Sequence, residues 1–445
     1  MMSLMVSEET RTVTSTTVRS SAPAVGESPA SMSDVAGVPD VAGVPDGTRA
    51  WATRLVVVGI VLSALNLRPA ITSLGALLEE VRDGLGMSGS LAGVLTSVPP
   101  LCFAVFGAMA PRLARRFGPG AVVCAGMAAI TAGLLIRPYA GSTAGFLAAS
   151  ALALMGIAVS NVLMPVIVKR WFPDRVGSMT GLYSMALALG TSAAAAVTVP
   201  MTETLGGSWQ TGLAVWAGLA AVAVLPWIPL VRDRGPAVTQ EPARGERHQP
   251  ALRITRSRTA WALAVFFGLQ ATAAYITMGW MAQIFRDAGV PAGTAGLLLA
   301  VTMVMGVPLA FVIPRLATRL PHQGPIVLAL GACGLAGYAG LYFAPAGGAW
   351  AWALLLGVSN CAFPLALTMV GMRARTGAGV AQLSAFAQST GYLISIPGPL
   401  LVGVLYQHSG GWGLPIALMA ALMVPQMAVG LLAGRDRTVE EEAAR

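Results

Sequence analysis

Long apolar segments alternate with short polar connections along most of the chain, from Arg54 onward. Twelve of these segments are long enough to cross a bilayer as α-helices, which takes about 20 residues each. Six come before a hydrophilic stretch at 232–258 and six come after it. We expect membrane-spanning helices at 53–77, 89–110, 119–139, 143–168, 177–201, 209–231, 259–284, 294–314, 323–343, 348–371, 379–404 and 411–433.

The composition favours the same environment. Of the 445 residues, 55% are hydrophobic and only 11% are charged. A water-soluble domain of this length needs far more charge to cover its surface, so the lipid bilayer is the expected solvent. The sequence therefore predicts an all-α polytopic membrane protein of about twelve helices, arranged as two six-helix halves.

The formal net charge of +9 comes mainly from arginines in short connections. They concentrate in every second connection and in the central stretch, which is typical of cytoplasmic loops. We therefore expect both termini in the cytoplasm, a location in the cell (inner) membrane, and no binding of nucleic acid. The predicted organisation is a disordered tail at 1–50, helical halves at 51–231 and 259–434, a cytoplasmic loop at 232–258 and a tail at 435–445.

The two halves repeat each other at a separation of about 200 residues, as a duplicated transporter requires. The basic turn Pro111–Phe117 (PRLARRF) recurs as Pro314–Leu320 (PRLATRL), and Ser160-Asn161-x-x-x-Pro165 recurs as Ser359-Asn360-x-x-x-Pro364. The basic turns are candidates for a cytoplasmic gate, although setting the topology is an equally good explanation of their charge. The gate candidates are Arg112, Arg115, Arg116, Arg315 and Arg319.

The turn Pro111–Gly118 resembles the loop between helices two and three of the major facilitator superfamily, with Arg115 in place of that loop's acidic residue. The segment Asn66–Ser73 (NLRPAITS) resembles the signature of the cyanate/2-nitroimidazole transporter (CynX/NimT) family. Ser160–Val166 and the segment around Gln270 fit the same family. The resemblance covers 54–433 and implies a transporter with the major facilitator fold.

Arg68 is the most informative single residue. It lies about 20 Å of helix from Arg54 and about 16 Å from Glu79, at a rise of about 1.5 Å per residue. A cation at that depth costs several kcal/mol unless it faces water, carbonyls or an anion inside the bundle. Pro69 follows directly and frees backbone carbonyls. Arg68 is either a structural arginine or an anchor for an anionic or electron-rich substrate, and we favour the anchor.

All three asparagines of the chain lie inside apolar segments, where their amides could bind a solute or join helices. Polar residues of the fifth, seventh and eleventh helices are further candidates for the pathway. The predicted substrate-binding residues are Asn66, Arg68, Thr72, Asn161, Tyr183, Gln270, Tyr275, Asn360 and Gln388.

No Asp, Glu or His lies deep in any apolar segment, so the sequence offers no intramembrane proton relay, metal site or set of catalytic groups. We expect no cofactor and no enzyme activity, and a sensor would need a soluble output domain. The favoured function is a monomeric, secondary active or facilitated transporter of a small polar or anionic solute that works by alternating access. The alternative is a drug or toxic-compound exporter of the same superfamily.

Overall fold

The structure, a computed structural model, describes residues 46–231 and 254–443. The predictions for residues 1–45 and 232–253 lie outside the described residues. The first group of helices consists of α1 (Asp46–Asn66), α2 (Pro69–Ala76), α3 (Leu78–Leu85), α4 (Gly89–Phe117), α5 (Pro119–Ile136), α6 (Thr143–Trp171), α7 (Val176–Thr204) and α8 (Trp209–Val224). The second consists of α9 (Arg258–Asp287), α10 (Ala292–Val304), α11 (Gly306–Arg319), α12 (Gly324–Phe343), α13 (Ala349–Ser359), α14 (Ala362–Met372), α15 (Gly377–Ser395), α16 (Pro397–Ser409), α17 (Gly413–Ala433) and α18 (Val439–Ala443).

Within the described ranges, twelve helical spans are long and apolar enough to cross a membrane, which confirms the predicted fold class. Their outward surface is apolar: Leu225, Phe343 and Val424 are each at least 60% exposed. Such a surface suits contact with lipid and not with water.

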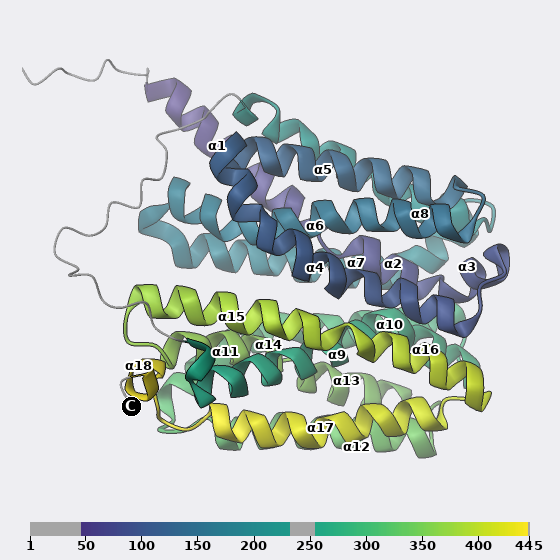
Figure 1. Cartoon of the computed structure of the whole chain (residues 1–445). Helices are drawn as coiled ribbons and strands as arrows, with labels where there is room; N and C mark the ends of the chain where they lie inside the picture. Colours follow the sequence, from purple (N-terminus) through teal and green to yellow (C-terminus); the bar gives the residue numbers. More distant parts are fainter. Residues whose placement is uncertain (1–45, 232–253, 444–445) are drawn as a thin grey trace, which may run out of the picture. The chain divides into compact units, whose positions relative to one another are not determined.

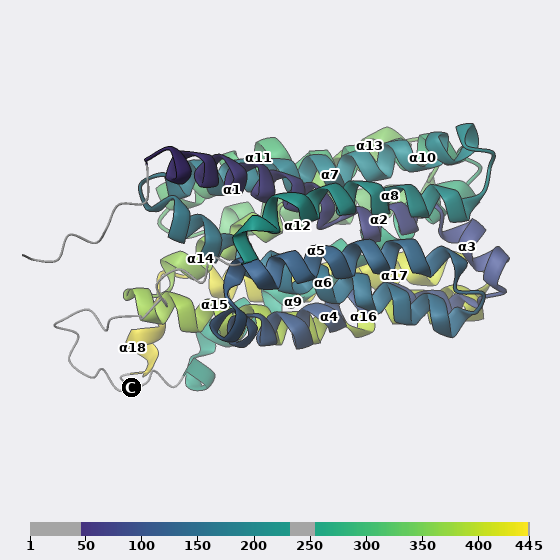
Figure 2. The same cartoon turned by 90° about the horizontal axis from the view of Figure 1, so that it is seen from above.

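The helices form two layers (Figure 1). We call α1–α8 the N-half and α9–α17 the C-half. Within the N-half α5 packs against α6 and α8, and within the C-half α12 packs against α13 and α17. The halves meet along α4 with α16 and along α7 with α10, while α2 packs against α9. Figure 2 shows the bundle from a perpendicular direction, with α3 at one end and α18 at the other. We call these the α3 end and the α18 end.

Four of the spans are interrupted near their middle. The breaks fall at Leu67–Arg68, Met305, Asn360–Cys361 and Ile396. Two of them directly precede a proline, which lacks the backbone N–H that a continuous helix needs and restricts the residue before it. Interrupted helices expose backbone groups inside the bundle, an arrangement found where membrane transporters bind solutes.

Two stretches predicted as turns or tails are helical. The basic segments Pro111–Phe117 and Pro314–Arg319 form the last turns of α4 and α11, because neither Pro111 nor Pro314 ends its helix. The first helix also starts at Asp46, inside the segment predicted as a disordered tail.

The predicted C-terminal tail contains the short helix α18, which is docked on the C-half. Val439 is buried, and its backbone N–H bonds the carbonyl oxygen of Arg373. The Glu442 carboxylate accepts hydrogen bonds from Ser257 Oγ (2.7 Å) and from the backbone N–H of Thr259 (3.0 Å) at the start of α9. A carboxylate at a helix N-terminus satisfies free N–H groups and complements the helix dipole. The segment therefore caps the C-half at the α18 end.

Candidate substrate-binding cavity

Arg68 lies at the break between α1 and α2. Its carbonyl oxygen accepts hydrogen bonds from the N–H groups of Ile71 (2.9 Å) and Thr72 (3.1 Å), which begin α2. The N-terminus of α2 is electropositive and the C-terminus of α1 is electronegative, so the two helix dipoles act on the guanidinium in opposite directions. The charge of Arg68 must be satisfied by other groups in the middle of the bundle.

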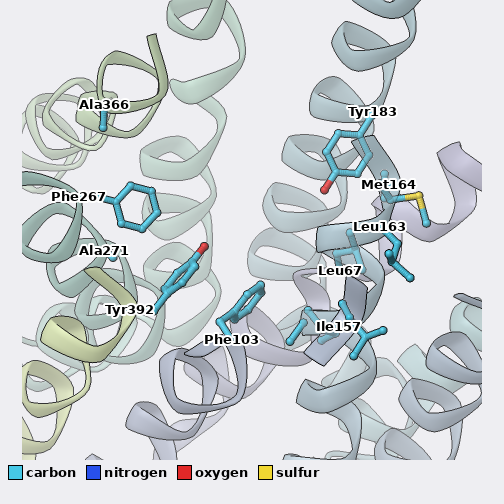
Figure 3. Packing of buried hydrophobic residues seen from close by; sticks show 14 of the residues in the cluster. Leu67, Phe103, Ile157, Leu163, Met164, Tyr183, Phe267, Ala271, Ala366 and Tyr392 are labelled. Carbon is cyan, nitrogen blue, oxygen red and sulfur yellow. The ribbon is translucent and has the colours of Figure 1, made fainter. Parts of the chain in front are cut away.

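Aromatic residues from both halves surround Arg68. Its guanidinium carbon stands 5.8 Å from the ring centroid of Phe103 on α4, a cation–π distance. Tyr275 on α9, Tyr183 and Tyr392 are close enough to the guanidinium to interact with it electrostatically. Figure 3 shows the hydroxyls of Tyr183 and Tyr392 directed into the space between the halves. Neutral rings and hydroxyls lower the cost of burying the cation but leave its charge uncompensated.

A cavity of about 500 Å³ opens beside Arg68 between the two halves. Its apolar wall includes Phe267, Met278, Met303 and Phe363. Its polar side chains are those of Arg68, Ser184, Thr191, Gln270, Tyr275, Thr302, Asn360, Thr368 and Tyr392, with the thiol of Cys361. Gln270 is only 4% exposed, and its side-chain oxygen has no hydrogen-bond partner. A buried acceptor without a partner costs free energy, so this oxygen suits a donor on a bound solute or a water.

The described lining of the cavity carries a positive charge and no negative charge. Among the described residues, Arg68 is the only lining side chain that is charged, and no Asp, Glu or His lines the wall. Four of the predicted substrate-binding residues meet here: Arg68, Gln270, Tyr275 and Asn360.

The other five predicted residues do not line the cavity. Asn66 donates hydrogen bonds to the carbonyl oxygens of Leu62 (2.7 Å) and Leu219 (3.2 Å), which joins α1 to α8. Thr72 bonds the Arg68 carbonyl, and Gln388 bonds Ser384 on its own helix. Asn161 accepts a hydrogen bond from Tyr183, so this pair acts on the cavity only through the hydroxyl beside Arg68.

Two aromatic residues next to Arg68 escaped the sequence analysis. Phe103 and Tyr392 stack at a centroid distance of 5.2 Å and form the aromatic surface next to Arg68. Phe103 is one apolar residue among many in its segment, and nothing in the local pattern marks it. Tyr392 could have been found, because it lies one turn beyond the polar residue Gln388 on the same helix.

The α3 end is closed by polar contacts between the halves. Arg286 on α9 forms salt bridges with Glu79 (2.8 Å) and Glu80 (2.9 Å) on α3. Gln407 on α16 accepts hydrogen bonds from the backbone N–H and the hydroxyl of Ser90 on α4. The sequence analysis placed these glutamates at a helix end and did not predict their pairing with Arg286.

Glycines allow the helix backbones to meet at this end. A Cβ at Gly75 would collide with the Met278 carbonyl on α9, and one at Gly403 would collide with the Gly89 carbonyl on α4. A Cβ at Gly93 would stand 2.8 Å from the Leu400 carbonyl. Since each colliding atom is backbone, no side-chain rotation could relieve the contact.

The cavity instead extends toward the α18 end. Its lining runs from Arg68 and Tyr275 as far as Pro314 and Thr368. A further cavity of about 230 Å³ continues between α7 and α11, lined by Thr180, Gly181 and Phe311 among others. The five predicted gate arginines lie exposed on the last turns of α4 and α11. In the described part of the chain, none of them forms a salt bridge. Their role as a gate stays a prediction.

Twelve spanning helices in two halves around a central cavity, closed at one end, define a membrane transporter of small molecules. The model of the Major Facilitator Superfamily matches residues 56–396. An uncharacterized transporter of Bacillus subtilis (strain 168) is 35% identical over 86% of this chain and 94% of its own. The 2-nitroimidazole transporter of Escherichia coli (strain K12) is 31% identical, over 86% of this chain and 96% of its own. The cyanate transport protein of the same organism is 29% identical, over 84% and 95%.

Solved structures agree on the fold. The xylose transporter XylE from E. coli in an inward open conformation gives a TM-score of 0.69 at 11% identity, over 88% of this chain and 99% of its own. The nucleoside transporter NupG gives 0.68, at 13% identity over 85% and 98%. This chain belongs to the Major Facilitator Superfamily.

Proposed function

We propose that the protein transports a small anionic or electron-rich solute, similar to cyanate or a nitroimidazole, across the cell membrane by alternating access. The observation that carries this proposal is the buried charge of Arg68 in a cavity whose described lining has no carboxylate. An arginine offers several N–H donors in a planar arrangement that matches carboxylate, nitro or similar groups. A bound anion would supply the missing counter-charge, and loss of the anion would leave the arginine buried and unpaired.

The shape and lining of the cavity favour a planar solute. Pockets of about 300–1,000 Å³ typically hold drug-sized molecules, and this cavity of about 500 Å³ falls in that range. Phe267, Tyr392 and Phe363 offer ring faces and edges for stacking. A nitro-aromatic solute could direct its negative oxygens to Arg68 while Gln270 accepts a hydrogen bond from a ring N–H. A three-atom anion such as cyanate would bind at Arg68 with water filling the remainder.

The predicted orientation completes the proposal. The described arginines outside the α3 end favour a cytoplasmic location for the α18 end by the positive-inside rule. The structure then corresponds to a state open to the cytoplasm. Because the described lining of the cavity contains no carboxylate or histidine, a coupled proton would have to travel on the solute itself. Transport would be facilitated diffusion, or it would be secondary active transport in which the solute itself carries the coupled proton.

Binding to purified protein gives the most direct test. Cyanate and 2-nitroimidazole should raise the melting temperature of the wild type and not that of Arg68→Ala. Arg68→Lys should respond weakly, because an ammonium group lacks the planar fork of donors. The control is Arg437→Ala, which removes an exposed arginine outside the spans and should respond as the wild type does. Stabilisation of Arg68→Ala by the same solutes would contradict the proposal.

The cavity's volume and apolar wall also favour a second candidate, an exporter of larger toxic compounds. The binding of lipophilic cations would distinguish these two candidate functions. An exporter of that kind should be stabilised by them, whereas the uncompensated charge of Arg68 should exclude them from the proposed site.

A further inference from the structure

An arginine that the sequence analysis did not single out also lies buried in the bundle. Arg137, at the end of α5, is only 2% exposed. Its Nη1 donates to the Ala70 carbonyl oxygen (2.9 Å), and its Nη2 lies 3.5 Å from Ser73 Oγ. The Arg137 guanidinium carbon stands 5.9 Å from the ring centroid of Phe146. Among the described residues, no carboxylate pairs with it.

Two polar atoms at this place have no partner. They are the Nε of Arg137 and the hydroxyl of Ser150 on α6, which is buried as well. Both residues line a chamber of about 20 Å³. That volume holds about one water molecule. An unpaired donor on a cation and an unpaired hydroxyl facing the same chamber form a set of groups that suits an anion or its polar group.

The chamber adjoins the central cavity, with Tyr275 as the dividing residue. Tyr275 lines both spaces, and it lies close enough to Arg68 to interact with it electrostatically. The chamber lies on the α3 side of Tyr275, since its other lining includes Leu74, Gly75 and Gly279. Arg68 therefore borders the central cavity, and Arg137 borders the chamber on its α3 side.

The wall of the chamber comes from both halves. Trp280 Nε1 on α9 donates to Thr96 Oγ1 on α4 (3.1 Å), and a Cβ on Gly279 would stand 2.7 Å from the Thr96 side chain. Any movement that separates the halves at the α3 end would break these contacts and enlarge the chamber. Contacts between the two halves thus close both the chamber and the α3 end.

From these observations we propose that Arg137 and Ser150 form a second station for the transported anion, occupied when the α3 end is open. The anionic or electron-rich group passes between Arg68 and Arg137 around the side chain of Tyr275. This proposal rests on the proposed function and adds a substrate site on the side of the bundle opposite to the open cavity. The ligand class is the same small anion that Arg68 binds, presented from the α3 side.

Side-specific kinetics in proteoliposomes of uniform orientation test the station, with cyanate and 2-nitroimidazole as probes. Ser150→Ala removes a hydroxyl that has no partner, so it should leave the melting temperature unchanged. It should raise KM from the α3 side about threefold, which corresponds to one lost hydrogen bond, without changing KM from the α18 side. Arg137→Gln should raise the α3-side KM more strongly, by about tenfold or more.

The matched control is Ser192→Ala, which removes another unpaired buried hydroxyl that lines neither space. It should leave both KM values unchanged. If Arg137→Gln does not fold, the comparison of Ser150→Ala with Ser192→Ala is sufficient to test the station. Equal changes from both sides, or none in Ser150→Ala, would overturn the station. Arg68→Ala separates the two proposals: transport that survives in Arg68→Ala contradicts the proposed function, whereas its loss together with symmetrical effects at Ser150 contradicts only the station.

Discussion

At the α3 end, salt bridges, hydrogen bonds and close glycine contacts join the two halves, whereas at the α18 end the exposed arginines of α4 and α11 make no salt bridge within the described residues. The position of the central cavity agrees with this difference: the cavity stops at the α3 end and extends toward the α18 end. Closure thus depends on a few identifiable contacts, and removing them should shift the population of states.

The largest effect is expected from the glycine contacts. In Gly403→Leu the added side chain would collide with the backbone of α4 at Gly89 and Gly93 and should hold the α3 end apart. In a background without native cysteines, a cysteine at Thr368, which lines the cavity, can report access to impermeant thiol reagents from either side. We expect labelling from the α3 side to increase about tenfold or more, which requires a shift of only about 1.4 kcal/mol.

The control for this experiment is Gly218→Leu, at a helix position where a Cβ would meet no neighbour within 4 Å. Its labelling should match that of the parent. Unchanged labelling of Gly403→Leu in a folded protein would show that the α4–α16 contact does not close the α3 end.

A smaller shift is expected from Arg286→Gln. The two salt bridges of Arg286 are partly exposed, at 40% for the Glu79 side chain and 33% for Glu80, so solvent weakens each of them. Such pairs typically contribute up to about 1 kcal/mol, which corresponds to about fivefold in the labelling ratio. The shift should shrink as ionic strength rises, because salt screens the wild-type pairs. A shift that is independent of salt would show that Arg286 acts through packing.

The smallest expected effect is a change in thermal stability that results from a substitution at the α18 end. Burial raises the pKa of the Glu442 carboxyl, but hydrogen bonds from Ser257 and Thr259 outweigh it, and the net pKa is below the ordinary value. The carboxylate therefore stabilises the fold fully above the ordinary pKa of about 4.3, and this contribution is lost as the pH falls through the lower pKa of the folded state.

We accordingly expect Glu442→Gln to lower the melting temperature at neutral pH by about 2 °C, for a helix cap worth about 1 kcal/mol. The difference from the wild type should disappear as the pH falls through the lowered pKa of the folded state. A difference that persists in acid would assign the effect to the shape of the side chain and not to its charge.

The fold could be predicted from the sequence because each spanning helix requires an apolar segment of a fixed length. The sequence analysis expected freed carbonyls at Pro69 but one continuous helix at 53–77, whereas the structure divides that helix at Leu67–Arg68. The ends of α4 and α11 could not be placed, because a proline such as Pro111 can be accommodated inside a membrane helix.

The site was predictable only in part. The depth of Arg68 follows from sequence spacing, but the direction of a side chain depends on packing between helices. Asn66 is buried at the same depth as Arg68, yet it faces α8 and bonds Leu219. Arg137 lies near the end of the predicted helix 119–139, where the sequence does not show that contacts with α2 and α6 bury it. Phe103 belongs to the site only because its ring centroid lies 5.8 Å from the guanidinium carbon of Arg68.

The central claim is that Arg68 binds the transported anion. Its most direct test is the exchange of labelled cyanate or 2-nitroimidazole in proteoliposomes containing wild type, Arg68→Ala or Arg437→Ala. The account predicts a loss of about 100-fold in Arg68→Ala, for two charge-assisted hydrogen bonds, and full exchange in Arg437→Ala. Exchange by folded Arg68→Ala at the wild-type rate would contradict it.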